Sequence, residues 1–310
     1  MSETRARIVV ISGPTASGKT DVALALARAQ GGELVGADSV QVYRGFDVGS
    51  AKPTKEELGG IAHHLIDVVD PDEAIDAARY AELADAAIAD VAARGKLPIV
   101  VGGTGLWLRA LLRGLVVLPP PDPAIRGALE EEVRTLGAPA LHARLAAIDP
   151  KASAAIHPND ALRIVRALEV HAQTGEPIGE LRARHALGAP RYDALVVLLD
   201  RPRPEMDARM VARTEAMLAR GLVDEVRGLI TRWGRGVRGL DSVGYAEVRA
   251  YLEGTLPERE LAPAITRATR VYARRQRTWW GHDETATRLT DASRFGEVPA
   301  LVERWREQAP

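Results

Sequence analysis

The sequence predicts an α/β protein in which helices cover a parallel sheet and a helical insertion domain interrupts the core. Three observations support this prediction. Short apolar runs alternate with amphipathic segments, glycines follow the helical patterns, and one long middle stretch has no strand pattern. The 310 residues suffice for one large α/β domain with a sizeable insertion. With 46% apolar and 27% charged residues, the composition is that of an ordinary globular protein.

The core elements follow from the periodicity of apolar residues along the chain. Helices are expected at Lys19–Gln30 and Ile75–Arg94, which end at glycines 31 and 95. Ligands of such sheets bind at the carboxyl ends of the strands, so the loops after the first, second and fourth strands should form one cleft. The expected strands are Ile8–Ser12, Glu33–Ala37, Leu65–Val69, Leu97–Val101 and Ala194–Leu199.

The regular alternation stops at the proline-rich connection Pro119–Pro123. Three helices without an intervening strand are expected after it, at Asp122–Leu136, Ala138–Ile148 and Asp160–Thr174. We therefore divide the chain into a first part of the core at residues 1–115, a helical insertion at 116–190 and a second part of the core at 191–310. The second part should end in basic helices, including Pro263–Trp280.

Directly after the first strand, the sequence fits the phosphate-loop pattern G-x-x-x-x-G-K-[ST]. Glycines let backbone N–H groups surround phosphate oxygens, the Lys19 ammonium adds a full charge, and the Thr20 hydroxyl can bind Mg²⁺. The alternative is a Gly-rich turn without a ligand, but the flanking strand and helix supply the context that the motif requires. The predicted fold is therefore P-loop NTPase-like. The loop comprises Gly13, Pro14, Thr15, Ala16, Ser17, Gly18, Lys19 and Thr20.

Composition and pattern exclude several classes of protein and site. The formal net charge of −1 argues against a uniformly basic nucleic-acid binder. The absence of cysteine excludes disulfides, thiolate metal sites and cysteine nucleophiles. His63 and His64 are adjacent on an extended segment and would face opposite sides, so they do not predict a metal site. The polar start and the lack of a long apolar stretch predict a cytoplasmic protein without a signal peptide or membrane span.

Polar residues follow two other strands whose ends should face the phosphate loop. Asp38 is compatible with Mg²⁺ binding, ribose positioning, proton abstraction or a structural Asx turn. Gln41 has an amide suited to reading a base edge. Thr104, between glycines, suits a ligand contact or a helix N-cap. The fourth strand lacks the Mg²⁺-binding aspartate of typical nucleoside triphosphatases, for which Asp67 and Asp200 are possible substitutes.

Basic residues concentrate near the end of the chain. Residues 266–280 contain five arginines and no acidic residue, and four of the arginines recur at steps of three, four and three on one helix face. An unbroken arginine face favours a phosphate-rich partner over surface decoration. Gln276, Trp279 and Trp280 add amide and aromatic groups suited to looped RNA, although Trp279 is also compatible with a core position. The four arginines are Arg267, Arg270, Arg274 and Arg277.

Taken in order, these motifs resemble those of bacterial tRNA dimethylallyltransferases over nearly the whole chain. Three positions depart from the family pattern: Ser50 replaces the usual threonine, Trp107 the usual tyrosine and Gly281 a basic residue. The resemblance is carried by Gly13–Thr20, Asp38–Tyr43, Gly49–Pro53, Gly102–Leu108, Arg166–Glu169, Met217–Val226, Val243–Tyr245 and Arg275–Trp279.

The resemblance implies transfer of a dimethylallyl group from dimethylallyl diphosphate to N6 of adenosine-37, 3′ of the anticodon in tRNA, with release of diphosphate. It implies Asp38 as general base, Thr104 as an orienting residue, Mg²⁺ held by Thr20, and Arg213 or Arg209 on the diphosphate. The expected partners are the tRNA anticodon stem-loop and the diphosphate substrate, with no membrane and no obligate protein partner, so that a monomer is expected. The implied tRNA contacts are Asp38, Ser39, Val40, Gln41, Thr104, Arg126, Leu162, Arg163, Ile164, Val165, Arg166, Val243, Gly244, Tyr245, Arg274, Arg275, Gln276, Arg277, Thr278, Trp279, Trp280 and Gly281.

Three other functions use parts of the same pattern. An adenylate dimethylallyltransferase would modify free AMP, a P-loop small-molecule kinase would use ATP, and a non-catalytic RNA-binding regulator would use a nucleotide as a switch. The insertion and the basic helix favour a macromolecular acceptor over AMP or a kinase substrate. The regulator would leave Asp38 and Thr104 without a chemical role.

Overall fold

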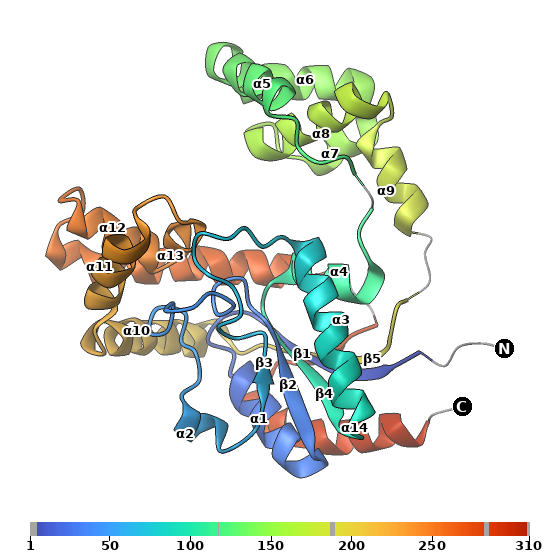
Figure 1. The fold of residues 1–310 in the computed structure, drawn as a ribbon, viewed down its shortest axis with the longest axis vertical. Coiled ribbons are helices and arrows are strands. Elements are labelled where there is room, and N and C mark those ends of the chain that lie inside the picture. Colours follow the sequence, from blue (N-terminus) through green and yellow to red (C-terminus); the bar gives the residue numbers. More distant parts are fainter. Residues whose placement is uncertain (1–4, 117, 187–189, 282–284, 309–310) are drawn as a thin grey trace. The chain divides into compact units, whose positions relative to one another are not determined.

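The computed structural model describes residues 5–116, 118–186, 190–281 and 285–308. The chain divides into two compact units, one formed by Met1–Leu112 with Arg191–Pro310 and the other by Arg113–Pro190. The first unit is a parallel sheet covered by helices, and the described residues of the second unit are helical or irregular (Figure 1). The predicted fold class is confirmed.

The first unit is built on a six-stranded sheet in the order β3-β2-β4-β1-β5-β6, with every pair parallel. In β1, Val9 and Ile11 join the core beneath two helices, and the equally buried Ile8 and Val10 alternate with them onto the other face. The sheet is therefore apolar on both faces. The strands are β1 (Arg7–Ser12), β2 (Gly32–Ala37), β3 (His63–His64), β4 (Leu97–Gly102), β5 (Asp193–Leu199) and β6 (Thr287–Leu289).

Four of the five predicted strands are confirmed to within one residue at each end, and the prediction of a strand at Leu65–Val69 is wrong. The strand there is the two-residue β3. Leu65 and Asp67 have φ angles of 62° and 56°, in the left-handed region that breaks an extended run. Val69 pairs only through an isolated bridge to Tyr43. The apolar run thus forms an irregular loop over the sheet edge.

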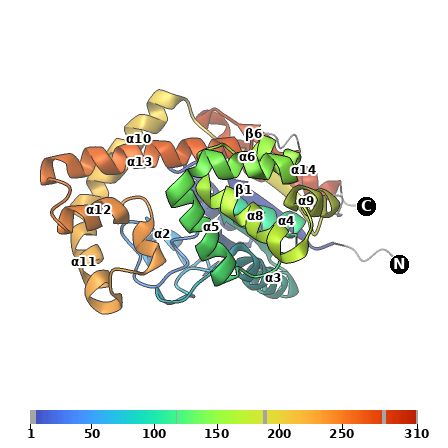
Figure 2. The same cartoon turned by 90° about the horizontal axis from the view of Figure 1, so that it is seen from above.

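Helices cover the sheet and extend the unit beyond it. α1 and α14 pack together on one face, and α13 lies alongside α10 (Figures 1 and 2). None of the described helices has the length and apolar character that a bilayer span requires. The helices of this unit are α1 (Lys19–Gln30), α2 (Lys55–Leu58), α3 (Ala77–Ala93), α4 (Gly105–Arg113), α10 (Arg203–Ala219), α11 (Leu222–Trp233), α12 (Tyr245–Leu252), α13 (Glu258–Trp279) and α14 (Val298–Glu307).

The second unit has its own apolar core, formed mainly by its first, second and fourth helices. Side chains of Asp122 and Asp160 cap two helices, as Asp commonly does at an N-cap. The predicted helices of this region are confirmed to within one residue, and two additional short helices are present. The helices are α5 (Pro123–Leu136), α6 (Ala138–Ile148), α7 (Pro150–Ala155), α8 (Ala161–Thr174) and α9 (Ile178–Ala186).

A buried carboxylate ties β2 to β3 and β4. Glu33 accepts hydrogen bonds from Arg94 at 2.6 and 2.7 Å and from Lys96 at 2.6 Å, and its Oε2 lies 2.8 Å from His64 Nε2. These partners hold the pKa of Glu33 well below its usual range, with the Arg94 hydrogen bonds contributing most. The stabilisation is therefore present above the unfolded-state pKa of about 4.3 and is lost as the pH falls toward the folded-state pKa.

We expect Glu33→Gln to lower the free energy of unfolding at pH 7 by about 1–3 kcal/mol, because Arg94 and Lys96 lose a buried, charged acceptor. Denaturant melts from neutral to acid pH should show the wild-type and variant stabilities converging in acid. Asp90→Asn is the matched control, since Asp90 is an exposed partner of the same Arg94 and should matter little. Parallel wild-type and Glu33→Gln curves would contradict this account.

Candidate active site

The predicted phosphate loop lies between β1 and α1. Gly18, with φ at 93°, occupies the left-handed region immediately before α1. The Ser17 hydroxyl is buried and has no hydrogen-bond partner among the described residues. Buried hydroxyls are normally bonded, so this orphaned donor fits a loop whose partner is an oxyanion.

Lys19 carries a cation into the interior at the start of α1. Its Nζ lies 3.4 Å from the Pro14 carbonyl. Burial lowers the pKa of Lys19 to about 8, Asp38 partly opposes this effect, and Arg213 adds to it. The ammonium is thus under-compensated by the protein alone, and a bound anion would restore its charged form.

Two arginines, one turn apart on α10, reach the same loop. Arg213 Nη1 donates to the Thr15 hydroxyl at 3.1 Å, and Arg209 Nε donates to the Ala16 carbonyl at 2.8 Å. Burial lowers the pKa of Arg213, an effect that Asp38 partly opposes. Arg209 is exposed, whereas Arg213 lines the interior cavity described below. Arg213 is therefore the better placed of the two for a buried anion.

A third arginine at the loop was not predicted. Arg201 Nε donates to the Ser17 carbonyl at 2.8 Å, and its guanidinium also pairs with Glu205 and lies 4.9 Å from the Phe295 ring centroid. The available signal in the sequence was its place directly after β5, at the carboxyl edge where ligands bind. Its partners make it a support for the loop backbone.

Asp38 and Thr104 lie together on the neighbouring strand ends. Asp38 Oδ1 accepts the N–H groups of Val40 at 2.9 Å and Gln41 at 3.2 Å, and the Thr104 hydroxyl accepts the Ser39 N–H at 3.1 Å. The Asx turn and a chemical role for Asp38 are thus compatible. Within the described part of the chain, its Oδ2 makes no hydrogen bond.

Lys19, Thr20, Asp38 and Arg213 line a cavity of about 340 Å³, together with residues of α13. Tyr272 and His63 also line it. Sequence reasoning missed Tyr272 and considered His63 only as a metal ligand, which it rejected. Burial raises the pKa of Tyr272 to about 12, to which Asp38 contributes, so the phenol stays protonated beside that carboxylate. Burial lowers the pKa of His63 to about 4, and both its ring nitrogens are buried without a partner among the described residues. Tyr272 lies one helical turn before Gln276, which was the available signal for it.

α13 fixes the phosphate loop through Gln276. Gln276 Oε1 accepts the Thr15 N–H at 2.7 Å, and its Nε2 donates to the Gly103 carbonyl at 3.1 Å. A Cβ on Gly103 would lie 2.2 Å from that Nε2, and a Cβ on Gly105 would lie 2.2 Å from the Trp279 ring. The glycines after β4 therefore permit close packing of α13. Gln276 is buried and braces two loops.

The predicted arginine face is largely neutralised by acidic residues from other turns and segments. The ion pairs are Arg277–Asp200 at 2.8 Å, Arg270–Asp207 at 3.0 Å and Arg267–Glu260 at 3.8 Å. Arg274 and Arg275 form no ion pair within the described residues, and Arg275 borders the cavity. Two of these three acidic partners lie in distant segments, so the sequence of residues 266–280 alone could not reveal them.

Several predicted RNA contacts have other roles or are buried. Gln41 Nε2 donates to the carbonyls of Ser50 at 3.0 Å and Ala51 at 3.2 Å. Tyr245 is buried, Gly244 is buried and Val243 is half-buried, and all three line the cavity. Trp280 Nε1 donates to the Ser12 hydroxyl at 3.1 Å, whereas Thr278, Trp279 and Gly281 are exposed.

The predicted contacts of the insertion divide in the same way. Ile164 and Val165 lie in the core of the second unit, so their side chains do not face solvent. Arg126 and Arg166 each pair with the fully buried Glu169 at 2.7 Å, whereas Leu162 is 75% exposed. The exposed Arg163 lies 3.2 Å from Asp160. Helical spacing placed these residues on α8 but did not distinguish its faces.

The residues suited to Mg²⁺ are few. Asp67 pairs with Lys52 at 2.5 Å and Asp200 pairs with Arg277, so neither is a ready ligand. The described residues contain no group of three or more acidic or histidine side chains arranged for a metal. Thr20 and Asp38 remain, both lining the cavity. This small set fits Mg²⁺, which retains waters and takes its other ligands from substrate phosphates.

We expect the affinity for Mg²⁺-pyrophosphate to decrease as the pH rises above 8, where Lys19 becomes neutral before binding. Below this pKa the ammonium is already formed. Above it, binding requires uptake of a proton, so the affinity should fall by about tenfold per pH unit. Calorimetric titrations across this range test the expectation.

Lys19→Arg is the matched control, because its guanidinium remains charged at these pH values. Protonation of pyrophosphate itself affects both proteins equally and cancels in the ratio of their affinities. A ratio of wild-type to Lys19→Arg affinity that does not change with pH would contradict this role of Lys19.

Comparison with known proteins agrees with this geometry. Residues 41–283 match the family model described as IPP transferase. The chain is 56% identical over 304 residues to a tRNA dimethylallyltransferase of Anaeromyxobacter sp. strain K, covering 98% of both chains, and 43% identical to one of Geobacter sulfurreducens, covering 96% of both. A crystal structure of a Bacillus halodurans tRNA isopentenylpyrophosphate transferase aligns with a TM-score of 0.72 and 36% identity over 97% of both chains. A eukaryotic dimethylallyltransferase described as acting on tRNA aligns with a TM-score of 0.81 and 26% identity, covering 98% of this chain and 80% of the other. The chain belongs to the IPP transferase family.

Proposed function

We propose that this protein transfers the dimethylallyl group of dimethylallyl diphosphate to N6 of adenosine-37 in the tRNA anticodon loop, releasing diphosphate. The observation that carries the proposal is the convergence of two partly buried cations, Lys19 and Arg213, with a phosphate loop on a cavity that Asp38 also lines. The relatives at 56% and 43% identity are named for this activity.

The first chemical requirement is to neutralise the leaving group. As the bond between the allylic carbon and the diphosphate oxygen breaks, negative charge grows on the diphosphate. Lys19, Arg213 and the loop N–H groups are preorganised for that charge, and Arg209 lies at the outer side of the same loop. Mg²⁺, held through Thr20, would add Lewis-acid stabilisation of the diphosphate oxygens when bound.

The second requirement is to accept a proton from the attacking amine. The N6 lone pair is delocalised into the purine, so attack on carbon is assisted by a base. Asp38 Oδ1 is held by two backbone N–H groups, and Oδ2 would accept the N6 proton. Thr104, fixed to the same turn by its bond to the Ser39 N–H, orients the acceptor beside it.

The tRNA contact is proposed from exposed groups in each unit. Arg274 and Arg275 on α13 carry charge that no acidic residue of the described chain pairs, and they suit backbone phosphates. Trp279, Thr278 and Gly281 are exposed at the end of the same helix, and Leu162 and Arg163 are exposed on α8. Base flipping would bring adenosine-37 to a buried diphosphate.

Incubation with Mg²⁺ and labelled dimethylallyl diphosphate tests the proposed activity. Label should enter an anticodon stem-loop carrying adenosine-37 and should not enter the same stem-loop with guanosine there. Parallel reactions contain AMP or ATP. Labelling of AMP alone would establish the adenylate transferase, and consumption of ATP without labelling of RNA would establish a kinase. Either result would refute the proposal.

Asp38→Ala should lower kcat by about 10²–10⁴-fold while the affinity for pyrophosphate stays within about threefold of the wild type. Asp38→Asn separates the two roles of this residue. Its amide oxygen can still accept the Val40 and Gln41 N–H groups, but it cannot serve as a base. Single-turnover rates that recover in Asp38→Asn would show that Asp38 only shapes the turn.

A further inference from the structure

Three segments of the recognised pattern have no role in the chemistry above: Gly49–Pro53, the residues around Glu225, and the region of Tyr245. In the structure they meet at the loop formed by residues 47–52. Gly49, Ser50 and Ala51 line the cavity. The loop is therefore part of the site wall, and what holds it in place affects the site.

Glu225, in the first turn of α11, gathers four donors on one carboxylate. Its Oε2 accepts the N–H groups of Asp47 at 3.1 Å and Val48 at 2.6 Å, and its Oε1 accepts the Gly49 N–H at 3.1 Å and the Tyr245 hydroxyl at 2.7 Å. Successive N–H groups form a concave binding site for an anion, which here is a side chain of the same protein. Burial and the Glu225 carboxylate raise the pKa of Tyr245, so its phenol remains a donor.

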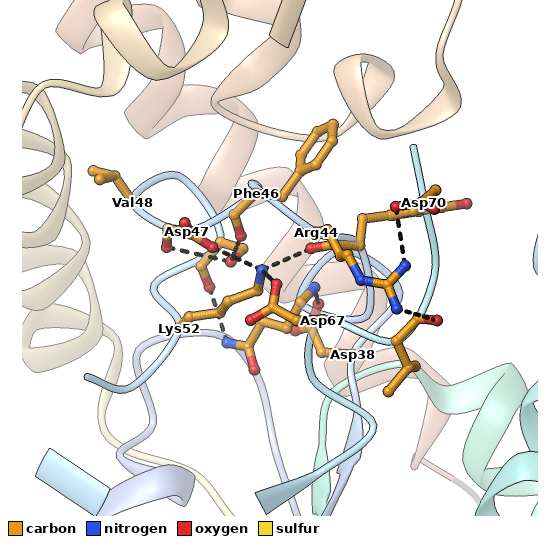
Figure 3. A network of polar contacts seen from close by, with 12 residues as sticks. Asp38, Arg44, Phe46, Asp47, Val48, Lys52, Asp67 and Asp70 are labelled. Carbon is orange, nitrogen blue, oxygen red and sulfur yellow. Dashed lines mark hydrogen bonds and ion pairs between the residues drawn. The ribbon is translucent and has the colours of Figure 1, made fainter. Parts of the chain in front are cut away.

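The loop is also held by Lys52, whose contacts Figure 3 shows. Lys52 Nζ donates to the Tyr43 carbonyl at 2.6 Å and pairs with Asp47 at 2.8 Å and Asp67 at 2.5 Å. Ala51 has a φ of 52°, a left-handed conformation that is unfavourable for alanine. Such a conformation persists only where surrounding contacts enforce it. Glu225 and Lys52 supply these contacts at the two ends of the loop.

The loop carbonyls face residues of the site. The Ser50 carbonyl accepts from Gln41 Nε2 at 3.0 Å and lies 3.5 Å from Arg213 Nη2. Gln41 belongs to the turn that Asp38 organises. Movement of the loop would therefore be transmitted both to the arginine beside the phosphate loop and to the turn that carries the proposed base.

We infer that Glu225 is a positioning residue that clamps the 47–52 loop and thereby keeps Arg213 and Gln41 in their places. Glu225 itself does not line the cavity, so it acts through the loop and not on the substrates. The inference deepens the proposed function and rests on it for its kinetic readout. It gives one role, holding the 47–52 loop, to the segments at Gly49–Pro53, Glu225 and Tyr245.

The test compares Glu225→Ala, Glu225→Gln and the matched control Asp224→Ala. Asp224 is the adjacent acid on α11, is exposed and pairs only with Arg227 among the described residues. Glu225→Ala should lower kcat by about 100-fold, as expected for misplacement of site groups by a remote change, with the KM for the stem-loop within about threefold. Glu225→Gln keeps an acceptor oxygen and should recover part of the loss, and Asp224→Ala should match the wild type.

Calorimetric titration with Mg²⁺-pyrophosphate gives a readout that does not depend on turnover. Glu225→Ala should weaken this affinity through displacement of Arg213, Glu225→Gln should lie between it and the wild type, and Asp224→Ala should match the wild type. If Glu225→Ala does not melt cooperatively, kcat and pyrophosphate affinity are measured for Glu225→Gln and Tyr245→Phe instead. Tyr245→Phe removes one hydrogen-bond donor to Glu225.

Equal kcat and pyrophosphate affinity in wild type and Glu225→Ala would overturn the inference, as would a loss confined to the KM for RNA. If Glu225→Ala is unfolded, wild-type values for both Glu225→Gln and Tyr245→Phe would overturn it equally. Failure of wild-type protein to label RNA would instead refute the proposed function. The pyrophosphate titrations would still test whether Glu225 positions the loop and Arg213.

Discussion

The first unit depends on keeping two partly buried cations, Lys19 and Arg213, beside one backbone loop. Each has its charged form disfavoured by burial, and the main acidic group opposing this is Asp38. Such an arrangement is costly in an empty protein and favourable once an anion enters. The parallel sheet makes it possible because β1 and β2 end at the same edge, delivering the loop and the carboxylate to one place.

α13 connects this charge site to the protein surface. Its inner face contributes Gln276, which holds both the phosphate loop and the turn after β4, and Tyr272, which lies against Asp38. Arg274 is exposed on the same helix, and Arg275 is exposed at the border of the cavity. One rigid helix therefore bears the residues that shape the site and residues suited to a polyanion outside it. Most of the other arginines on this helix stabilise the unit through ion pairs.

Much of this architecture could be predicted from the sequence because the signals are local. The phosphate loop, α1 and the four strands follow from motif and periodicity, and the strand ends brought Asp38 and Thr104 together as expected. The predictions that were wrong depend on distant partners or on backbone conformations that the apolar pattern does not reveal. Arg277 looked free because Asp200 lies in another segment, and the 65–69 run looked extended although its backbone turns back through left-handed residues.

The roles of glutamine side chains illustrate the same limit. Gln41 and Gln276 suited base recognition by residue type, but the structure uses both amides to brace loops. An amide can serve either purpose, and only its burial and partners decide between them. The sequence pattern includes Glu225 but does not indicate a role for it. Its role as an acceptor for the N–H groups of residues 47–49 is seen only in the structure.

The central claim is that the phosphates held by the loop belong to the leaving group and are not transferred. The most direct measurement counts products of one reaction containing stem-loop RNA, dimethylallyl diphosphate, ATP and Mg²⁺. Our account predicts one pyrophosphate released for each adenosine-37 that gains a C₅H₈ unit by mass spectrometry, with ATP unchanged. RNA or another acceptor that gains phosphate as ATP is consumed would contradict it.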